Sequence, residues 1–418
     1  MPTSAECDDT VSLRLCTRRD FLRTCLHGGA GLLAATLVGV PAFAQAGGNT
    51  TAAQAMTEGI PIAGLIAEEL TALDGVVLGI MKRHAIPCAS LAVSKDGKVV
   101  AKRAYGYAEP AHTRPLQTDA LFRIASCDKM LMASAVDRLA AEGWTVQGTG
   151  ETFDRDLRIF RSMKAVGFIG PELTNVDPRL YDVTIGQMVD HKSGIAVLYP
   201  PVGDVQAFLK LDRLPKQSEV IKWHINQKLT ADPGSKGASY YNNTAYGMLY
   251  GIVEWLTGST MVYIRDHVLE TAGSTEIDLS RTRPSDRNPK EVWYSTLNTG
   301  VSIFPEDAGA RLPTTDGGTV SWDDTLIFSA EALVRYLSKW YIGTGKPLLD
   351  DKGQLASGLD NGFGIYYGEY VGTLTTMFQR RWTMCNAALL FNQNEGPPGV
   401  AAEDIAKPLL DVLEKTGW

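Results

Sequence analysis

The sequence predicts an α+β fold in which both ends of the chain contribute strands to one antiparallel sheet. Near the N-terminal end, residues 89–94 and 98–103 read as strands joined by an Asp96-Gly97 turn, which is typical of a β-hairpin. Near the C-terminal end, residues 373–380 and 385–392 read as two further strands. Between these pairs the chain is mostly helical and loop-rich. We therefore expect helices packed on the sheet, a mostly helical lobe inserted between its halves, and a cleft between the two lobes.

Apolar residues at helical spacing predict four further helices, over residues 60–84, 244–258, 329–341 and 402–415. The chain has no internal repeat and no long linker. We therefore assign residues 47–418 to a single domain. Its α/β lobe comprises about residues 60–125 and 325–418, and its helical lobe comprises about residues 126–324.

The first 46 residues resemble an export signal. Arg18-Arg19 is followed by apolar residues, as in a twin-arginine leader, and Ala42-Phe43-Ala44 offers a small-x-small cleavage site. The apolar stretch at 28–40 is shorter than the roughly 20 residues needed to span a bilayer. We expect residues 1–46 to be removed and the protein to be periplasmic or secreted, without stable membrane association. The alternative is a retained N-terminal anchor.

Net charge and cysteine content limit the partners, disulfides and cofactors that we expect. The formal net charge is −7 and there is no basic tract, which argues against nucleic acid. Three of the six cysteines follow the leader, namely Cys88, Cys127 and Cys385, and an odd number leaves at least one free thiol. A Cys88–Cys385 disulfide stays open. No Cys/His cluster has zinc spacing, so we expect no metal and no other cofactor.

Ser126 and Lys129 open a helix-like run over residues 126–143. Residues three apart lie on one face of a helix, so the lysine is placed to act on the serine. A serine hydroxyl needs a base within hydrogen-bonding reach to become a good nucleophile. The alternative is an N-cap serine followed by a surface lysine. Cys127 follows the serine directly and is expected to pack inward.

Tyr241 is the second candidate catalytic residue. It follows the Asp232-Pro233-Gly234 turn and comes just before the predicted helix 244–258, which places it on a loop that can face a cleft. A tyrosine can act as a general base when a neighbouring ammonium favours its phenolate. The alternative is a core tyrosine in the aromatic-rich patch around it.

Three segments together resemble the serine β-lactamase and penicillin-binding-protein family. Residues 122–129, Phe-Arg-Ile-Ala-Ser-Cys-Asp-Lys, are similar to its nucleophile motif, and residues 183–195 to the segment that packs beside the site. Residues 239–246 are similar to its Tyr-x-Asn loop. The order and spacing match, in particular, class C β-lactamases, D-alanyl-D-alanine carboxypeptidases and family VIII carboxylesterases. The resemblance spans roughly residues 60–415 and implies the β-lactamase/transpeptidase-like fold.

The resemblance implies roles for individual residues. Ser126 would be the nucleophile that forms an acyl-enzyme, and its backbone N–H would be one oxyanion donor. Lys129 and Tyr241 would form a proton-shuttling pair, and Asn243 would orient the lysine or the substrate. For Lys129 to act as a base, its pKa would have to fall from about 10.4 toward 7–8. His191 is expected to be structural and to hold its loop.

The family's third motif, Lys-Thr-Gly or His-x-Gly, is less clear. Tyr366-Tyr367-Gly368 occupies its slot before strand 373–380, so Tyr366 would replace the family's cation and Gly368 would support the site. Loss of this cation, which would hold a substrate carboxylate, favours an esterase over a β-lactamase. The literal Lys415-Thr416-Gly417 at the C-terminus is interpreted as coincidence. Residues 362–365 resemble a segment that normally ends well before this motif, so the chain lacks most of a strand or loop there. Either the site is shorter and more open, or the alignment with the family fails at this motif.

The sequence thus predicts a serine hydrolase that cleaves carboxylic esters or small amides through an acyl-serine. The alternatives are a β-lactamase or D-alanyl-D-alanine carboxypeptidase, and a catalytically degenerate relative that binds peptidoglycan or another ligand. Asp128 and Lys192 are unusual in their motifs, but both can be surface residues. The expected partner is a small-molecule ester or amide substrate, and the oligomeric state stays open.

Overall fold

The computed structural model describes most of the chain after residue 58. The predicted leader, residues 1–46, lies outside the described residues, as do parts of the loops between residues 281 and 361. The described residues belong to one compact unit. They are residues 59–200, 202–280, 287–294, 300–301, 311–312, 326–342, 345–350, 356, 362–370, 372–393 and 402–417.

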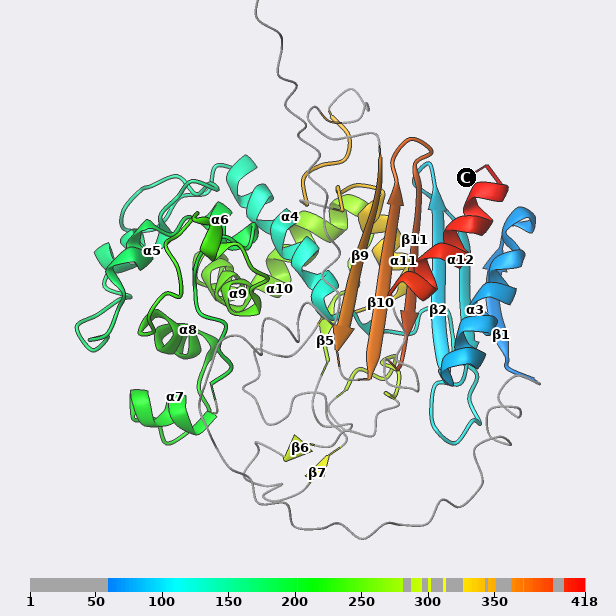
Figure 1. The fold of residues 1–418 in the computed structure, drawn as a ribbon, viewed down its shortest axis with the longest axis horizontal. Helices are drawn as coiled ribbons and strands as arrows, with labels where there is room; N and C mark the ends of the chain where they lie inside the picture. The colour runs from blue at the N-terminus through cyan, green and yellow to red at the C-terminus, as the bar shows by residue number, and fades with distance from the viewer. Residues whose placement is uncertain are drawn as a thin grey trace, which may run out of the picture. The chain divides into compact units, whose positions relative to one another are not determined.

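A six-stranded antiparallel sheet is the centre of the fold, with strand order β1-β3-β2-β11-β10-β9 (Figure 1). Its strands come from both ends of the chain, and a mostly helical region lies between them in sequence, so the predicted fold class is confirmed. The strands are β1 (Ile62–Ile66), β2 (Cys88–Lys95), β3 (Lys98–Gly106), β9 (Phe363–Tyr370), β10 (Thr373–Arg380) and β11 (Cys385–Phe391).

The β2–β3 hairpin forms where the sequence predicts it. Lys95 pairs with Lys98 across the turn, and Asp96 and Gly97 both have positive φ, of 51° and 75°. A two-residue turn of this kind requires positive φ at both positions, which explains the strength of the Asp-Gly signal.

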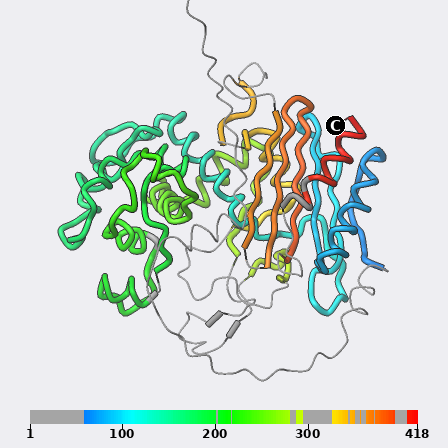
Figure 2. Tube along the Cα trace, in the orientation of Figure 1, coloured from blue at the N-terminus to red at the C-terminus, as the bar shows by residue number. Residues whose placement is uncertain are grey.

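Both faces of the sheet are covered, so the central strands β2 and β11 are mostly apolar and almost fully buried. On β2, the side chains of Ala89, Leu91 and Val93 belong to one core together with α3 (Ala72–His84) and α12 (Ala402–Lys415). Cys88 and Ala92 belong to the other core, with α4 (Asp128–Ala141) and α11 (Ala330–Leu337). Figure 2 shows α3, in blue, beside α12, in red. Lys415-Thr416-Gly417 ends α12 in this outer layer, whereas α4, which follows Ser126, packs on the other face.

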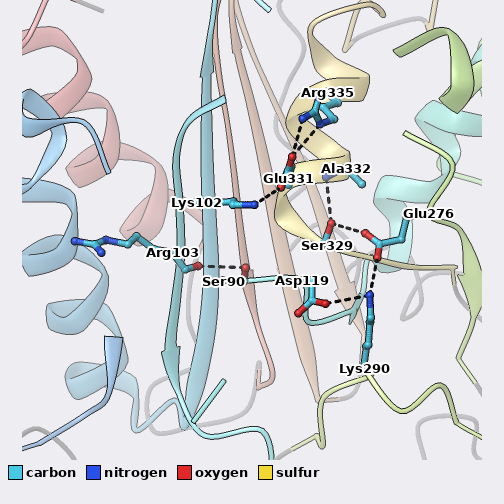
Figure 3. A network of polar contacts seen from close by, with 10 residues as sticks. All are labelled: Ser90, Lys102, Arg103, Asp119, Glu276, Lys290, Ser329, Glu331, Ala332 and Arg335. Atoms are coloured by element: carbon cyan, nitrogen blue, oxygen red, sulfur yellow. Dashed lines mark hydrogen bonds and ion pairs between the residues drawn. The ribbon is translucent and has the colours of Figure 1, made fainter. Parts of the chain in front are cut away.

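A polar network fixes α11 to the sheet (Figure 3). Glu331 of α11 accepts hydrogen bonds from Lys102 of β3, at 3.0 Å, and from Arg335 one turn later, at 2.7 Å. The N-cap of α11, Ser329, donates to Glu276 at 2.7 Å. Because Glu276 lies far from α11 in sequence, the cap also connects the middle of the chain to the sheet layer.

Along the sequence, the helical lobe and two small sheets come between the N-terminal strands β1–β3 and the C-terminal strands β9–β11 of the main sheet. A three-stranded sheet has the order β4-β8-β5, and β6 pairs with β7. The small strands are β4 (Phe122–Arg123), β5 (Asp278–Leu279), β6 (Gly300–Val301), β7 (Arg311–Leu312) and β8 (Leu326–Phe328). The remaining helices are α5 (Ile159–Ala165), α6 (Ile185–Val189), α7 (Val202–Leu209), α8 (Gln217–Ile225), α9 (Asn243–Thr257) and α10 (Thr260–Tyr263).

One predicted helix is partly wrong. Residues 62–66 form the edge strand β1, paired with β3 from Ile62–Tyr105 to Ile66–Ala101, and the helix begins only at Ala72. The apolar positions of this segment fit both the helical and the strand period. Pairing with the long strand β3 favours the strand. In the described part of the chain, no helix is long and apolar enough to cross a membrane.

Candidate active site

Ser126 lies on a tight turn, residues 124–127, that leads from β4 into α4. Ala125 has a φ of 45°, in the left-handed region that residues with a Cβ rarely adopt, and the Cys127 N–H donates to the Ile124 carbonyl at 3.0 Å. Such strain costs of order 1–3 kcal/mol and persists where the surroundings impose it. This strained residue directly precedes Ser126, the candidate nucleophile.

Strands β9 and β10 hold this nucleophile turn in place. Thr373 and Thr375 both donate side-chain hydrogen bonds to the Arg123 carbonyl, at 2.8 and 3.1 Å. Cys127 packs inward, as predicted, and its thiol faces the Thr375 carbonyl at 3.9 Å. On β9, the backbone at Gly368 comes so close that a Cβ there would lie 1.9 Å from the Ile124 carbonyl oxygen. Only glycine fits this approach.

Lys129 reaches back toward Ser126 along one face of the helix. Its Nζ donates to Ser126 Oγ at 3.3 Å, as the spacing predicts. Nζ also lies 5.1 Å from the ring centroid of Tyr241 and 5.5 Å from that of Tyr246. The lysine side chain is almost completely buried. Two tyrosine rings and one hydroxyl therefore surround a single desolvated ammonium.

The direction of the Lys129 pKa shift bears on whether this lysine can act as a base. Burial lowers its pKa, but interactions with Tyr241 and Asp128 outweigh burial, so the pKa of Lys129 is raised above its usual range. The fall toward 7–8 that a role as base would require is therefore not found in the unliganded site. A raised pKa favours the ammonium form, and Nζ is placed as a hydrogen-bond donor to Ser126 Oγ.

His191 and Asn242 fix the loop that carries Tyr241. The Asn242 N–H donates to His191 Nδ1 at 3.0 Å, and the imidazole packs against the Tyr241 ring in a tilted arrangement, with centroids 4.6 Å apart. Asn242 caps α9 by accepting from the Ala245 N–H at 2.8 Å, and its Nδ2 donates to the Ile195 carbonyl at 2.6 Å. Each contact is on the loop side of Tyr241, and the tyrosine itself stays exposed at the site.

Asn243 contacts a residue that the sequence reasoning missed. Its Nδ2 donates to the Tyr199 hydroxyl at 2.8 Å, and Tyr199 also acts on the charge of Lys129. The Tyr199 side chain is about half exposed. Tyr199 lies on the loop after α6, whose course cannot be derived from spacing, and its only local signal is the following Pro200. The contact extends the rim of the site from Tyr241 to this loop.

Tyr366 and Gly368 both lie on β9, the edge strand beside the nucleophile turn. Burial raises the pKa of Tyr366 well above its usual range, and Tyr241 and Tyr246 act in the same direction. Residues 363–365 run directly into Tyr366, with no intervening loop or strand. Residues 363–370 form one continuous strand that pairs with β10 from Tyr370–Thr373 to Phe363–Arg380.

Asp128 is not a surface residue, although the sequence left that position open. Its side chain is largely buried, and its Oδ1 lies 3.9 Å from Lys129 Nζ. Lys192 is exposed. Cys88, Cys127 and Cys385 are all buried free thiols, so the open Cys88–Cys385 pairing is not formed. No group of potential metal ligands occurs among the described residues.

Two buried histidines predict loss of stability in mild acid. Burial lowers the pKa of both His191 and His224 from 6.5 to about 4, and for His191 the charge of Lys129 adds to the effect. The unfolded chain therefore binds more protons than the folded chain between about pH 6.5 and 4, and stability falls as the pH falls through that window. We expect each histidine to contribute about 2 kcal/mol of lost stability between pH 8 and pH 5.

Urea unfolding at pH 8 and pH 5 measures this effect. His224→Gln removes one titrating group, and His191→Asn keeps an acceptor near the position of Nδ1. Each variant is expected to lose less stability on acidification than the wild type. An unchanged difference between pH 8 and pH 5 in both variants would contradict the prediction.

Comparison with known proteins gives the class of protein that this site belongs to. A sequence model of the family described as Beta-lactamase matches residues 73–384, which is more than half of the chain. The protein belongs to the Beta-lactamase family.

Named relatives show how widely this family varies in function. Esterase EstB of Burkholderia gladioli is 32% identical over 253 residues, covering 57% of this chain and 60% of the relative. A D-aminopeptidase of Cereibacter sphaeroides is 26% identical over 270 residues, covering 63% of this chain and 46% of the relative. The chain thus spans about half the length of the curated relatives it matches. The family and these relatives indicate hydrolase activity.

Solved structures share the fold at lower sequence identity. The D-amino acid amidase of Ochrobactrum anthropi SV3 aligns with a TM-score of 0.57 at 17% identity, covering 83% of this chain and 100% of that one. The octameric penicillin-binding protein homologue from Pyrococcus abyssi aligns with a TM-score of 0.55 at 18% identity, covering 82% and 77%. These likenesses support the fold class alone.

Proposed function

We propose that this protein is a serine hydrolase that cleaves carboxylic esters or small amides through an acyl-serine, with carboxylesterase-like preference. One observation carries the proposal. Ser126 Oγ accepts a hydrogen bond from the buried Lys129 ammonium, and the same ammonium faces the ring of Tyr241. A nucleophile, a cation and a possible base thus meet at one point on rigid elements.

In the proposed reaction, the Ser126 hydroxyl proton passes to the Tyr241 phenolate as Oγ attacks the substrate carbonyl carbon. When the bond to the leaving group breaks, that proton passes from Tyr241 to the leaving oxygen or nitrogen. Water then attacks the acyl carbon and gives its proton to Tyr241. The acyl–Oγ bond breaks, Ser126 regains a proton, and the carboxylic acid product leaves.

Lys129 supports this cycle as a cation rather than as the first base. An ammonium cannot accept a proton, so we propose that Lys129 acts as a positive charge beside Ser126 and the Tyr241 ring. The Ser126 N–H is the proposed oxyanion donor on the nucleophile turn. Asn243 and Tyr199 form a polar rim that we propose contacts the substrate.

Tyr366 supports an esterase over a β-lactamase or D,D-peptidase. Substrates of the latter two carry a carboxylate that a cation in the third-motif slot would bind. In this chain Tyr366 stands on β9 in that slot, beside Gly368 and the nucleophile turn. An uncharged phenol there offers no ion pair to a carboxylate. The matched relatives include an esterase, which agrees with this preference.

Intact-protein mass spectrometry tests the proposal. Purified protein is mixed in parallel with a fluorophosphonate probe, p-nitrophenyl butyrate and a cephalosporin, and peptide mapping locates any adduct. We expect one fluorophosphonate adduct, on Ser126, with rapid ester turnover and slow or absent cephalosporin turnover. Rapid cephalosporin turnover would instead favour the β-lactamase alternative. The absence of an adduct with all three reagents would leave the non-catalytic binding protein.

A further inference from the structure

Asp128 directly precedes the lysine of the site, and its carboxylate is close to the lysine ammonium. Oδ1 lies 3.9 Å from Lys129 Nζ, and the two side chains are only 19% and 7% exposed. Oδ1 is fully buried and has no hydrogen-bond partner among the described residues. Tyr250 approaches the carboxylate without forming a well-aligned hydrogen bond. The charge of Asp128 therefore acts on Lys129 mainly through space.

Burial alone would favour a neutral amine at Lys129. A desolvated ammonium is unstable unless an opposite charge lies near it, and an opposite charge within about 4–6 Å favours the charged form. Tyr241 and, after it, Asp128 raise the pKa of Lys129 against burial, and the Asp128 carboxylate lies on the same helix, next to the lysine in sequence. Its own pKa is raised by burial, which the charge of Lys129 opposes.

We propose that Asp128 is a positioning residue that keeps Lys129 an ammonium directed at Ser126 and thereby leaves Tyr241 as the proton acceptor. The inference rests on the proposed hydrolase function and concerns which residue accepts the Ser126 proton in that reaction. A carboxylate close to Nζ stabilises the ammonium, and an ammonium cannot accept the Ser126 proton. In the proposed reaction that proton therefore goes to the Tyr241 oxygen.

Other titratable groups face this pair from each packed element, so their influence must be separated from that of Asp128. They are Tyr241 on the loop before α9, Tyr246 and Tyr250 on α9, His191 and Tyr199 on the loop after α6, Tyr366 on β9, Cys127 on the nucleophile turn, and Arg155 and Asp190 beyond Tyr246. A test must therefore change the charge of Asp128 and leave these groups intact.

Asp128→Asn removes the charge with little change of shape. Without a negative charge beside it, the Lys129–Tyr241 pair releases its protons at lower pH. We expect both limbs of the pH profile of kcat/KM for p-nitrophenyl butyrate to move about one unit toward acid. At pH values below the wild-type optimum, kcat/KM of the variant is then expected to be about tenfold higher than for a substitution that changes only the shape of the side chain. Asp128→Glu restores the carboxylate and is expected to return the limbs toward their wild-type position.

Asp137→Asn is the matched control. It lies on the same helix with similar burial, and its carboxylate binds Arg155 at 2.6 Å. We expect this variant to keep the wild-type limbs even if it loses stability. Should Asp128→Asn fail to fold, Asp128→Ser gives the same loss of charge in a smaller side chain.

The readouts separate this inference from the proposed function. Fluorophosphonate labelling of Ser126 in the wild type tests the hydrolase itself. If labelling occurs but folded Asp128→Asn keeps both limbs within about 0.3 unit of the wild type, the role of Asp128 is overturned and the hydrolase stands. If the wild type neither labels nor turns over ester, the proposed function has failed first.

Discussion

Ser126→Ala is expected to lower kcat/KM for p-nitrophenyl butyrate by about 10⁴-fold or more, equivalent to roughly 5.5 kcal/mol of transition-state stabilisation. The substitution removes the only atom proposed to bond to the substrate carbon, Oγ. Lys129 and Tyr241 remain in place but have no nucleophile to activate. Since Ser126 is half-buried and its backbone is held by neighbouring residues, we expect the thermal midpoint to change little.

Ser134→Ala provides a contrast on the same helix. Ser134 is fully buried, donates to the Gly345 carbonyl at 2.8 Å and contacts the Tyr336 hydroxyl at 2.9 Å. Its loss should cost about 1–2 kcal/mol of stability while leaving ester turnover near the wild-type rate. Turnover within tenfold of the wild type in folded Ser126→Ala would exclude Ser126 as the nucleophile.

Gly368→Ala is expected to destabilise the fold by about 3 kcal/mol and to slow acylation of Ser126. The new Cβ would lie 1.9 Å from the Ile124 carbonyl oxygen and 2.9 Å from the Cys127 nitrogen, both of them backbone atoms that cannot rotate away. Either β9 must shift outward or the nucleophile turn must move. Both movements displace Ser126 relative to Lys129, so urea unfolding and the rate of fluorophosphonate labelling should change together.

Gly79→Ala shows what the same substitution does where space is available. Gly79 is an exposed residue inside α3, and a Cβ there would meet no atom within 4 Å. Alanine favours helix over glycine by about 1 kcal/mol, so this variant should be slightly more stable than the wild type. A Gly368→Ala protein as stable as the wild type would mean that β9 does not press on the turn.

The sequence predicted the parts of this fold that depend on local signals. The Asp96-Gly97 hairpin, the C-terminal strands and α12 follow from turn chemistry and periodicity over short windows. The strand β1 did not follow, because its apolar positions fit two periods and only its pairing with β3 decides between them. Helix and strand are distinguished there by a contact across about 40 residues, which no local pattern contains.

The candidate site was likewise only partly predictable from the sequence. The proximity of Ser126 and Lys129 follows from helical spacing, and the position of Tyr241 follows from its place before a helix. The burial of Asp128 and the upward direction of the Lys129 pKa did not follow, because both depend on what α9 brings against α4. Tyr199 was not predicted either, because its loop shows no periodic pattern of apolar residues. Its contact with Asn243 depends on the three-dimensional fold.

The anchoring of the nucleophile turn has a consequence for biosynthesis. The Thr373 and Thr375 side chains that bind the Arg123 carbonyl are separated from it by 250 and 252 residues of chain. During synthesis, Ser126 therefore leaves the ribosome long before β9 and β10 are made. These long-range contacts form late. A nascent chain that ends before residue 363 contains Ser126, Lys129 and Tyr241 but lacks the strands that fix their turn. The proposed hydrolase would then acquire its reactive geometry only near the end of synthesis.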